Sequence, residues 1–561
     1  MTASVAPPGP DRRGVHRLLA AAVFAATLAA LVLGGRSVGI TRDEGVYMEA
    51  GRRYGAWAAR LVHAPARALA ERDRTFSFNW EHPDLLKTAF GLSARLLAQP
   101  PVADRDGPGD DGGRWPILPE SAAMRLPAQA IAALGTALLF WVAARRWSIP
   151  AGLVAAGAFI LAPRVYFHAH LAAFDVPVAV AIFAVVLLYR RSLRSARALV
   201  PLAVVFGLAI ATKLNALFVG PLLYLHYLAV LARAHLRGRP VGLRALVPAW
   251  ALAAAAGGPL VAFALWPWLW SDPAGRFAAF VRFHAAHPWY NMEYLGVNYN
   301  LPPLPVSYPF VLTAATVPTT VLVLAVAGLC VFAVCELRRP AGEGDGGPAV
   351  GFWAPLRPGD DDRTGLLFVL FALWPLALIA WPTVPIFGGT KHWFPAYPFF
   401  ALAAGFAFHR LVRGVRPVLR AAAAALVLLP ALSTTARSHP YGLSAYVAFA
   451  GGARGGARLG LGRGFWGHAV VDLLPALPAR GRIYPHDLHA LARRTYVREG
   501  RWSPALLPAG PAAAGTALYF PERHMAADEV RIWNGLGTTR PSAMTTLHDV
   551  PLCLRYDRPP P

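Results

Sequence analysis

The chain has 561 residues, of which 56% are hydrophobic and only 15% are charged, against roughly 25% charged in soluble domains. This composition excludes an ordinary soluble protein and predicts a multi-pass protein of the cell membrane, with the lipid bilayer as a partner. The formal net charge of +24 could suggest nucleic-acid binding. However, the basic residues cluster in short segments between the apolar stretches, as the positive-inside rule requires, so we expect no nucleic-acid partner.

Runs of apolar residues predict about eleven transmembrane helices, because a helix needs about 20 residues to cross the hydrocarbon core. They are expected at 18–33, 122–143, two within 150–189, two within 199–232, 246–266, 309–334, 365–381, 393–409 and 418–433. With a cytoplasmic N-terminus, every short Arg-rich loop lies inside, namely 145–149, 190–198, 233–245, 336–364 and 410–420. The long loops 37–121 and 267–308 and the C-terminus are then extracytoplasmic.

The tail after the last apolar run differs from the rest of the chain. Residues 436–561 contain no predicted span, while Ile483-Tyr484 and 516–520 have strand-like composition. A helix start is expected at 485–487, directly after the first of these strands. The sequence therefore predicts an all-α polytopic module at 1–435, followed by a small extracytoplasmic α/β domain.

Neither a disulfide framework nor a metal site is indicated. Three cysteines occur, at positions 330, 335 and 553, and they form no Cys-x-x-Cys motif. No spacing of His, Asp and Cys demands a metal ion. We therefore predict no metal ligands and no certain cofactor, and a metal requirement stays open.

Two acidic residues, Asp43 and Glu44, follow the first predicted span directly. Carboxylates at this place can simply form a solvated helix end. Alternatively, one of them acts as a general base that takes the proton from an acceptor hydroxyl. Further along, the segment 79–87 contains Glu81 and His82, which suit either a polar substrate pocket or a helix lying on the membrane surface.

Basic residues interrupt several apolar runs on the same predicted face. Ionisable groups near apolar spans are costly and tend to be functional, although long side chains can also extend to the interface. Together these residues could hold a phosphate at the membrane surface: Arg125, Arg164 with His168, Lys213, and Lys391 with His392. Asp175, two residues before Pro177, is typical of a helix start, so we expect capping, with a place in the substrate pocket as the alternative.

A carboxylate base beside several cations favours displacement of a phosphate leaving group from a sugar. Phosphate leaves as an anion and needs only positive charge nearby. Glycoside hydrolysis would instead require a second, protonated carboxyl group for the leaving oxygen. A single displacement would invert the anomeric carbon.

The motifs resemble those of the protein O-mannosyltransferase and aminoarabinose transferase family, which is glycosyltransferase family 39 of the GT-C class. The resemblance covers most of 15–470 and lies in the order of these motifs: Thr41-Arg42-Asp43-Glu44, Glu81-His82-Pro83-Asp84-Leu85-Leu86-Lys87, Arg125-Leu126-Pro127, 163–177, Thr212-Lys213-Leu214-Asn215, Thr390-Lys391-His392 and 439–452. It departs from the family pattern at Asp84, which replaces the second Pro, and at Lys391-His392.

This resemblance implies a GT-C-like fold and an extracytoplasmic active site. It also implies a lipid-linked sugar donor, a polyprenyl-phosphate sugar of the kind used by mannosyltransferases in protein glycosylation, and an acceptor hydroxyl on a protein, lipid or glycan. By motif position, Asp43 would be the base with Glu44 as its neighbour. The candidates for binding the donor phosphate would be Lys87, Arg125, Lys213 and Lys391.

The main alternative is a transporter or flippase for a lipid-linked or amphipathic solute. Such a protein would use broken helices near the middle of the membrane and often an inverted repeat. The chain shows no internal repeat, and its notable charges lie at one predicted face. We therefore expect an enzyme.

Overall fold

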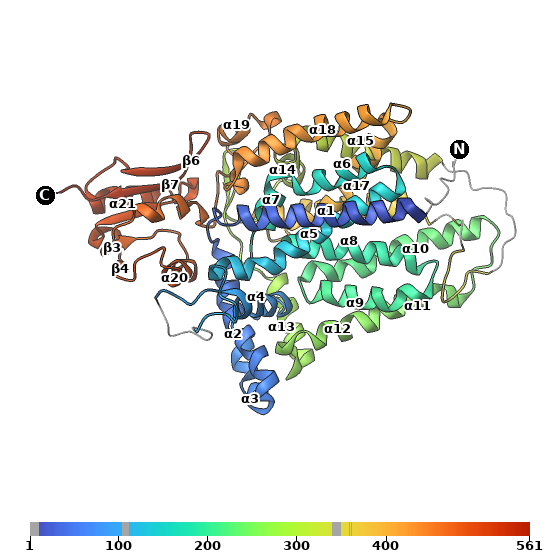
Figure 1. The fold of residues 1–561 in the computed structure, drawn as a ribbon, viewed down its shortest axis with the longest axis horizontal. Coiled ribbons are helices and arrows are strands. Elements are labelled where there is room, and N and C mark those ends of the chain that lie inside the picture. Colours follow the sequence, from blue (N-terminus) through green and yellow to red (C-terminus); the bar gives the residue numbers. More distant parts are fainter. Residues whose placement is uncertain are drawn as a thin grey trace.

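The computed structural model describes residues 10–103, 111–338, 349–357, 360, 362–386 and 388–560, with side chains from residue 14. Most of these residues are helical, which confirms the predicted fold class. Long helices lie side by side in a bundle, and a small domain containing a sheet lies beyond one end of it (Figure 1). Helix α1 (Pro10–Gly34) begins at the opposite end.

Each predicted span coincides with a helix or a broken helix. In chain order these are α1 (Pro10–Gly34), α5 (Glu120–Arg146), α6 (Ile149–Ile160), α8 (Asp175–Ser192), α9 (Leu199–Ile210), α10 (Val219–Leu236), α11 (Ala249–Leu252) continued by a π-helical turn into α12 (Gly258–Ala264), α14 (Tyr308–Thr316) with α15 (Thr319–Arg338), α16 (Thr364–Ala380), α17 (Tyr397–Leu411) and α18 (Pro417–Ser438).

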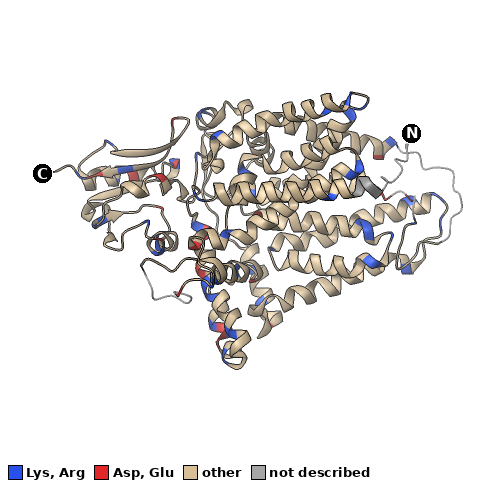
Figure 2. Ribbon diagram, viewed as in Figure 1, with Lys and Arg blue, Asp and Glu red and all other residues tan. Residues whose placement is uncertain are grey.

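Length and apolarity show a multi-pass membrane protein. Among the described residues, six helices are long and apolar enough to cross a bilayer, or seven if the bent pair α6 and α7 (Pro163–Ala169) is one span. The total of about eleven stays a prediction, because several of the other helices are shorter. Large apolar side chains on the bundle surface, such as Leu134, Leu260 and Leu426, are exposed, as expected for contact with lipid. Lys and Arg concentrate at the helix ends, while the middles carry few charges (Figure 2).

Two predicted spans begin or break differently from the expectation. The span predicted at 309–334 is two helices, because Pro318 lacks the N–H needed to continue α14. The span predicted at 393–409 starts as the 3₁₀ segment η6 (Gly389–Ala396), and the α-helix begins only at Tyr397. Part of the loop predicted at 336–364 lies outside the described residues.

The segment 37–121 is not a simple polar loop. It contains α2 (Arg42–His63), α3 (Pro65–Phe76) and α4 (Leu85–Leu97). The packing of α2 against α4 depends on glycine, since a Cβ at Gly91 would lie 1.8 Å from the carbonyl oxygen of Gly51. The other long loop, 267–308, contains α13 (Pro273–Ala285) and the hairpin of β1 (Met292–Tyr294) and β2 (Val297–Tyr299).

The C-terminal α/β domain is confirmed. Its five-stranded sheet has the order β4-β3-β5-β7-β6, with β3 (Gly481–Tyr484), β4 (Leu506–Pro508), β5 (Thr516–Tyr519), β6 (Ala543–Leu547) and β7 (Val550–Asp557). Its helices include α19 (Gly452–Arg458), α20 (Ala490–Arg498) and α21 (Ala526–Leu536). Strands β3 and β5 occur where they were predicted. The helix start expected at 485–487 is wrong by a few residues, because His489 is the N-cap of α20.

Candidate functional site

A cavity of about 610 Å³ lies where the bundle, the loop 267–308 and the C-terminal domain meet. Its polar lining includes Arg42, Asp43, Glu81, His82, Arg164, Lys213, Lys391 and His392. Its apolar lining includes Phe218, Leu312, Leu378, Ile379 and Val384. The C-terminal domain adds Asp487, His489, Glu522 and His524. The cavity can therefore contact a ligand that has both a charged and an apolar part.

Asp43 reaches the cavity because α2 begins beside it. Thr41 is the N-cap of this helix and forms a capping box with Glu44, a pattern that satisfies two unpaired N–H groups of the first turn. Asp43, in that first turn, accepts a hydrogen bond of 2.9 Å from Lys391 Nζ. The Lys391 ammonium also lies 4.3 Å from the ring centroid of Trp466. The structure thus brings together Asp43 and Lys391, which lie 348 positions apart in the sequence.

Glu44 and Arg125 pair with each other away from the cavity. Glu44 is fully buried and accepts bonds of 2.6 and 2.8 Å from Arg125 Nε and Nη2. It also accepts a bond of 2.9 Å from the Ala172 N–H. Arg125 further donates to the carbonyls of Gly35, Val38 and Gly39. Neither residue lines the cavity, and Arg125 instead attaches Glu44 to the segment before α2.

Lys87 is also absent from the cavity lining. Its ammonium is completely buried and donates to the carbonyls of Asn79 and His82 at 2.6 and 2.8 Å. Asp84, the departure from the family pattern, lies 3.8 Å away and is equally buried. Burial lowers the pKa of Lys87, while the Asp84 carboxylate acts in the opposite direction. Lys87 therefore fixes the loop from Asn79 to Asp84.

This loop presents Glu81 and His82 to the cavity. The His82 Nε2 atom lies 3.2 Å from the Tyr47 hydroxyl. Burial lowers the pKa of His82 well below its usual range, and the positive charges of Lys87 and Lys213 lower it further. His82 is therefore neutral at physiological pH and can exchange a hydrogen bond with Tyr47 or a ligand.

Lys213 lies in the break between α9 and α10, where the 3₁₀ segment η2 (Leu214–Phe218) begins. Its ammonium donates to Asp175 Oδ1 at 2.6 Å, and His168 Nδ1 lies 3.5 Å from the other carboxylate oxygen. Asp175 makes no capping hydrogen bond to α8, so the expected capping role is wrong. Lys213 lines the cavity, whereas Asp175 and His168 do not. Asp175 holds the Lys213 ammonium in place, and His168 contacts Asp175.

Sequence reasoning missed the contribution of the C-terminal domain. The Asp487 carboxylate pairs with Arg42, the neighbour of Asp43. The Nδ1 atom of His489 accepts a bond of 3.3 Å from the Leu491 N–H. A neutral His489 therefore carries its proton on Nε2. No local motif marks these residues, because they enter the site only through the docking of α20 against α2.

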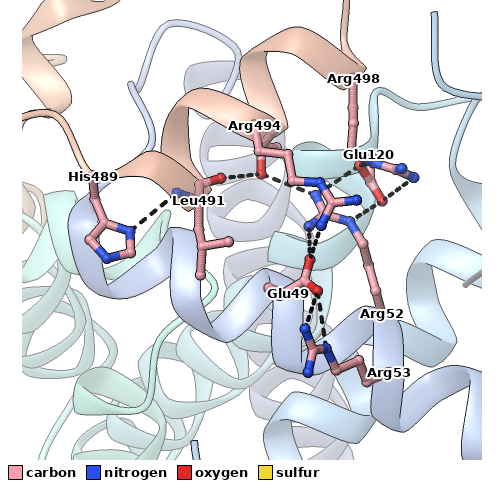
Figure 3. A network of polar contacts seen from close by, with 9 residues as sticks. Glu49, Arg52, Arg53, Glu120, His489, Leu491, Arg494 and Arg498 are labelled. Atoms are coloured by element: carbon pink, nitrogen blue, oxygen red, sulfur yellow. Dashed lines mark hydrogen bonds and ion pairs between the residues drawn. The ribbon is translucent and has the colours of Figure 1, made fainter. Parts of the chain in front are cut away.

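A buried ion-pair network holds α20 on the bundle (Figure 3). Glu120 of α5 accepts from Arg52 Nε at 2.8 Å and from Arg498 Nε at 2.9 Å. Glu49 of α2 forms ion pairs with Arg52, Arg53 and Arg494. Close packing accompanies this network, since a Cβ at Gly45 would lie 2.6 Å from the Ala492 nitrogen. The C-terminal domain is therefore an integral wall of the cavity.

Glu522 should make stability depend on pH. Burial and the carboxylates of Asp487 and Glu293 raise the pKa of Glu522 to about 8 from a usual value of 4.5, although Arg42 opposes the shift. The folded state then binds more protons than the unfolded state across this range, so stability falls as pH rises through it. We expect the unfolding temperature of Glu522→Gln to fall less than that of the wild type between about pH 5 and pH 8. Equal slopes in thermal unfolding scans would contradict this.

Among the described residues, no group of three or more His, Cys, Asp and Glu side chains is arranged to hold a metal ion. Three cations of the cavity, Arg42, Lys213 and Lys391, instead pair with single carboxylates. The arrangement can bind a phosphate, accept a proton and contact an isoprenoid chain.

No protein-family model and no curated protein matches the chain. Among solved structures, ArnT from Cupriavidus metallidurans bound to undecaprenyl phosphate is similar over 95% of this chain and 97% of that chain, with 14% identity and a TM-score of 0.47. The apo state of ArnT from the same organism has the same coverage, 15% identity and a TM-score of 0.45. At this similarity, neither structure assigns a ligand or a reaction to this chain.

Proposed function

We propose that the chain is a membrane glycosyltransferase that moves a sugar from a polyprenyl-phosphate donor to an acceptor hydroxyl. One observation carries this proposal: the Asp43–Lys391 pair, at 2.9 Å, faces a cavity that also contains Lys213 and an apolar wall. Phe218 lies at the end of the short helix that follows Lys213. The lysines can bind a phosphate group, and the apolar wall can contact the isoprenoid chain attached to it.

In the proposed reaction, the acceptor oxygen attacks the anomeric carbon and the bond from this carbon to the phosphate oxygen breaks. The phosphate leaves with the electron pair, and Asp43 takes the proton of the acceptor hydroxyl. Lys391 and Lys213 counter the charge that develops on the phosphate. Because Lys391 donates a hydrogen bond to Asp43, an arriving phosphate would compete for Lys391 and release the carboxylate to act as a base.

The cavity holds more carboxyl groups than the sequence indicated, since Glu81, Asp487 and Glu522 also line it, and the raised pKa of Glu522 keeps that group protonated near neutral pH. A glycoside hydrolase needs a pair of carboxyl groups and no cation at the leaving group. Here the basic side chains Arg164, Lys213 and Lys391 line the same cavity as the apolar wall. This combination favours a lipid phosphate donor over a glycoside.

We further propose that the cavity and the C-terminal domain are extracytoplasmic, with residues 1–435 as the membrane module and 436–561 as the soluble part. The Arg-rich loops at the opposite end of the helices support this orientation. A reporter fused after Pro561 should then be active only outside the cytoplasm. The motif resemblance makes mannose the first sugar to test, with protein, lipid and glycan hydroxyls as candidate acceptors.

The test is a donor panel with the purified full chain in lipid nanodiscs. We expect transfer from a radiolabelled polyprenyl-phosphate sugar, and none from a nucleotide sugar, because the apolar wall contributes to donor binding only through the lipid. Transfer from the nucleotide sugar alone would overturn the proposal. Movement of the lipid-linked sugar across the liposome membrane, without transfer of the sugar to an acceptor, would support the transporter alternative.

A further inference from the structure

Arg164 has an environment unlike that of the other cations in the cavity. It lies in the first turn of α7, and only 4% of its surface is exposed. Its guanidinium carbon lies 5.1 Å from the ring centroid of Tyr446. Its Nε atom has no hydrogen-bond partner among the described residues, and none of their carboxylates forms an ion pair with it.

Each of the other cavity arginines and lysines has a carboxylate partner. Arg42 pairs with Asp487, Lys213 with Asp175 and Lys391 with Asp43. A buried charge without an opposite charge beside it is costly, and residues placed in this way near apolar spans are usually functional. The positive charge of Arg164 is therefore available to a ligand in the cavity without first breaking an ion pair.

The surroundings of Arg164 also suit an anion. A Cβ on Gly389, where η6 begins, would lie 3.5 Å from Arg164 Nη1. The first turn of η6 receives no side-chain cap, and both Gly388 and Gly389 line the cavity. Val384, part of the apolar lining, is five residues from Gly389 in the same connection.

We propose that Arg164 is the primary anchor for the phosphate group of the ligand that occupies this cavity. The identity of that ligand as a lipid phosphate rests on the proposed function. Arg164 can bind two phosphate oxygens through its planar guanidinium. Lys391 and Lys213 share their charge with carboxylates, so they attract the phosphate less strongly than Arg164 does. Binding therefore begins at Arg164, and release of Asp43 from Lys391 follows it.

The test measures phosphate binding to the full chain in detergent, with undecaprenyl phosphate as the lipid probe and inorganic phosphate as the soluble probe. We expect Arg164→Gln to weaken undecaprenyl phosphate binding by about tenfold or more, as is typical when a charged hydrogen-bonding partner is lost. Arg164→Lys should recover part of the affinity, because it keeps the charge but not the planar fork. Arg197→Gln, at an exposed site in the Arg-rich loop after α8, is the matched control.

Thermal unfolding separates an anchor from a structural role. Without ligand, Arg164→Gln should unfold at the same temperature as the wild type or higher, because it removes an uncompensated buried charge. With undecaprenyl phosphate, only the wild type and the Arg197→Gln control should gain their full stabilisation. A fall in the unliganded unfolding temperature with unchanged affinity would overturn the proposal in favour of packing against Tyr446.

The remaining outcomes distinguish this inference from the proposed function. If inorganic phosphate binds as tightly as the lipid and depends equally on Arg164, the anchor stands but the ligand is a soluble phosphate. If the lipid binds through Arg164 and no donor supports sugar transfer, the glycosyltransferase proposal fails alone. If Arg164→Gln binds each probe as tightly as the wild type does, or if neither probe binds the wild type, the proposal that Arg164 is the anchor is overturned.

Discussion

Asp43→Asn is expected to abolish sugar transfer while leaving the fold and donor binding intact. Asparagine has nearly the same shape, but its amide cannot accept the proton of the acceptor hydroxyl. Loss of a general base typically costs about 10²- to 10⁴-fold in rate. Because Lys391 would no longer be held by a carboxylate 2.9 Å away, binding of the donor phosphate should stay equal or become tighter. The measurement is single-turnover transfer together with a donor binding isotherm.

Asp272→Asn is the matched control for this variant. Asp272 caps α13 by accepting a bond of 3.0 Å from the Gly275 N–H, and asparagine caps helices about as well. It should therefore transfer sugar at the wild-type rate. If Asp43→Asn also kept that rate, Asp43 would not be the base. Glu81 and Glu522 would then be the next carboxylates to substitute in the cavity.

Arg125→Gln is expected to produce the largest loss of stability. The substitution leaves Glu44, which is fully buried, without the two hydrogen bonds that Arg125 donates to it. Removing one partner of a buried ion pair typically costs about 3–5 kcal/mol. The start of α2 would also lose its attachment to the carbonyls of Gly35, Val38 and Gly39. The unfolding temperature in detergent should fall sharply, and activity should fall with it because Asp43 loses its position.

The double variant Glu44→Gln, Arg125→Gln tests whether the pair is the cause. It removes both charges, so it should be less destabilised than the sum of the two single variants. A different result is expected if Arg125 is a phosphate ligand, as the sequence predicted. In that case Arg125→Gln would keep its unfolding temperature and lose donor affinity, and the structural assignment would be wrong.

Local patterns in the sequence were sufficient for the parts of the fold that depend on neighbouring residues. Apolar runs located the long helices, because a span must be apolar over consecutive turns. The strands near Ile483 and Thr516 were likewise visible as local patterns. The break at Pro318 was not predicted, although it has a local cause in the missing N–H of proline.

Composition and local pattern were enough to predict a basic, multi-pass membrane chain with a C-terminal α/β domain and a set of charged residues that interrupt its apolar runs. They could not decide which of these charges share a site, since Asp43 and Lys391 are separated by 348 positions. Only the tertiary structure directed Asp43 into the cavity and Glu44 toward Arg125, although the two carboxylates are adjacent in the chain. The physical reason is that neighbouring residues of a helix point in directions about 100° apart, so each meets different elements. The placement of Arg42 against Asp487 likewise required the docking of α20, which no local pattern encodes.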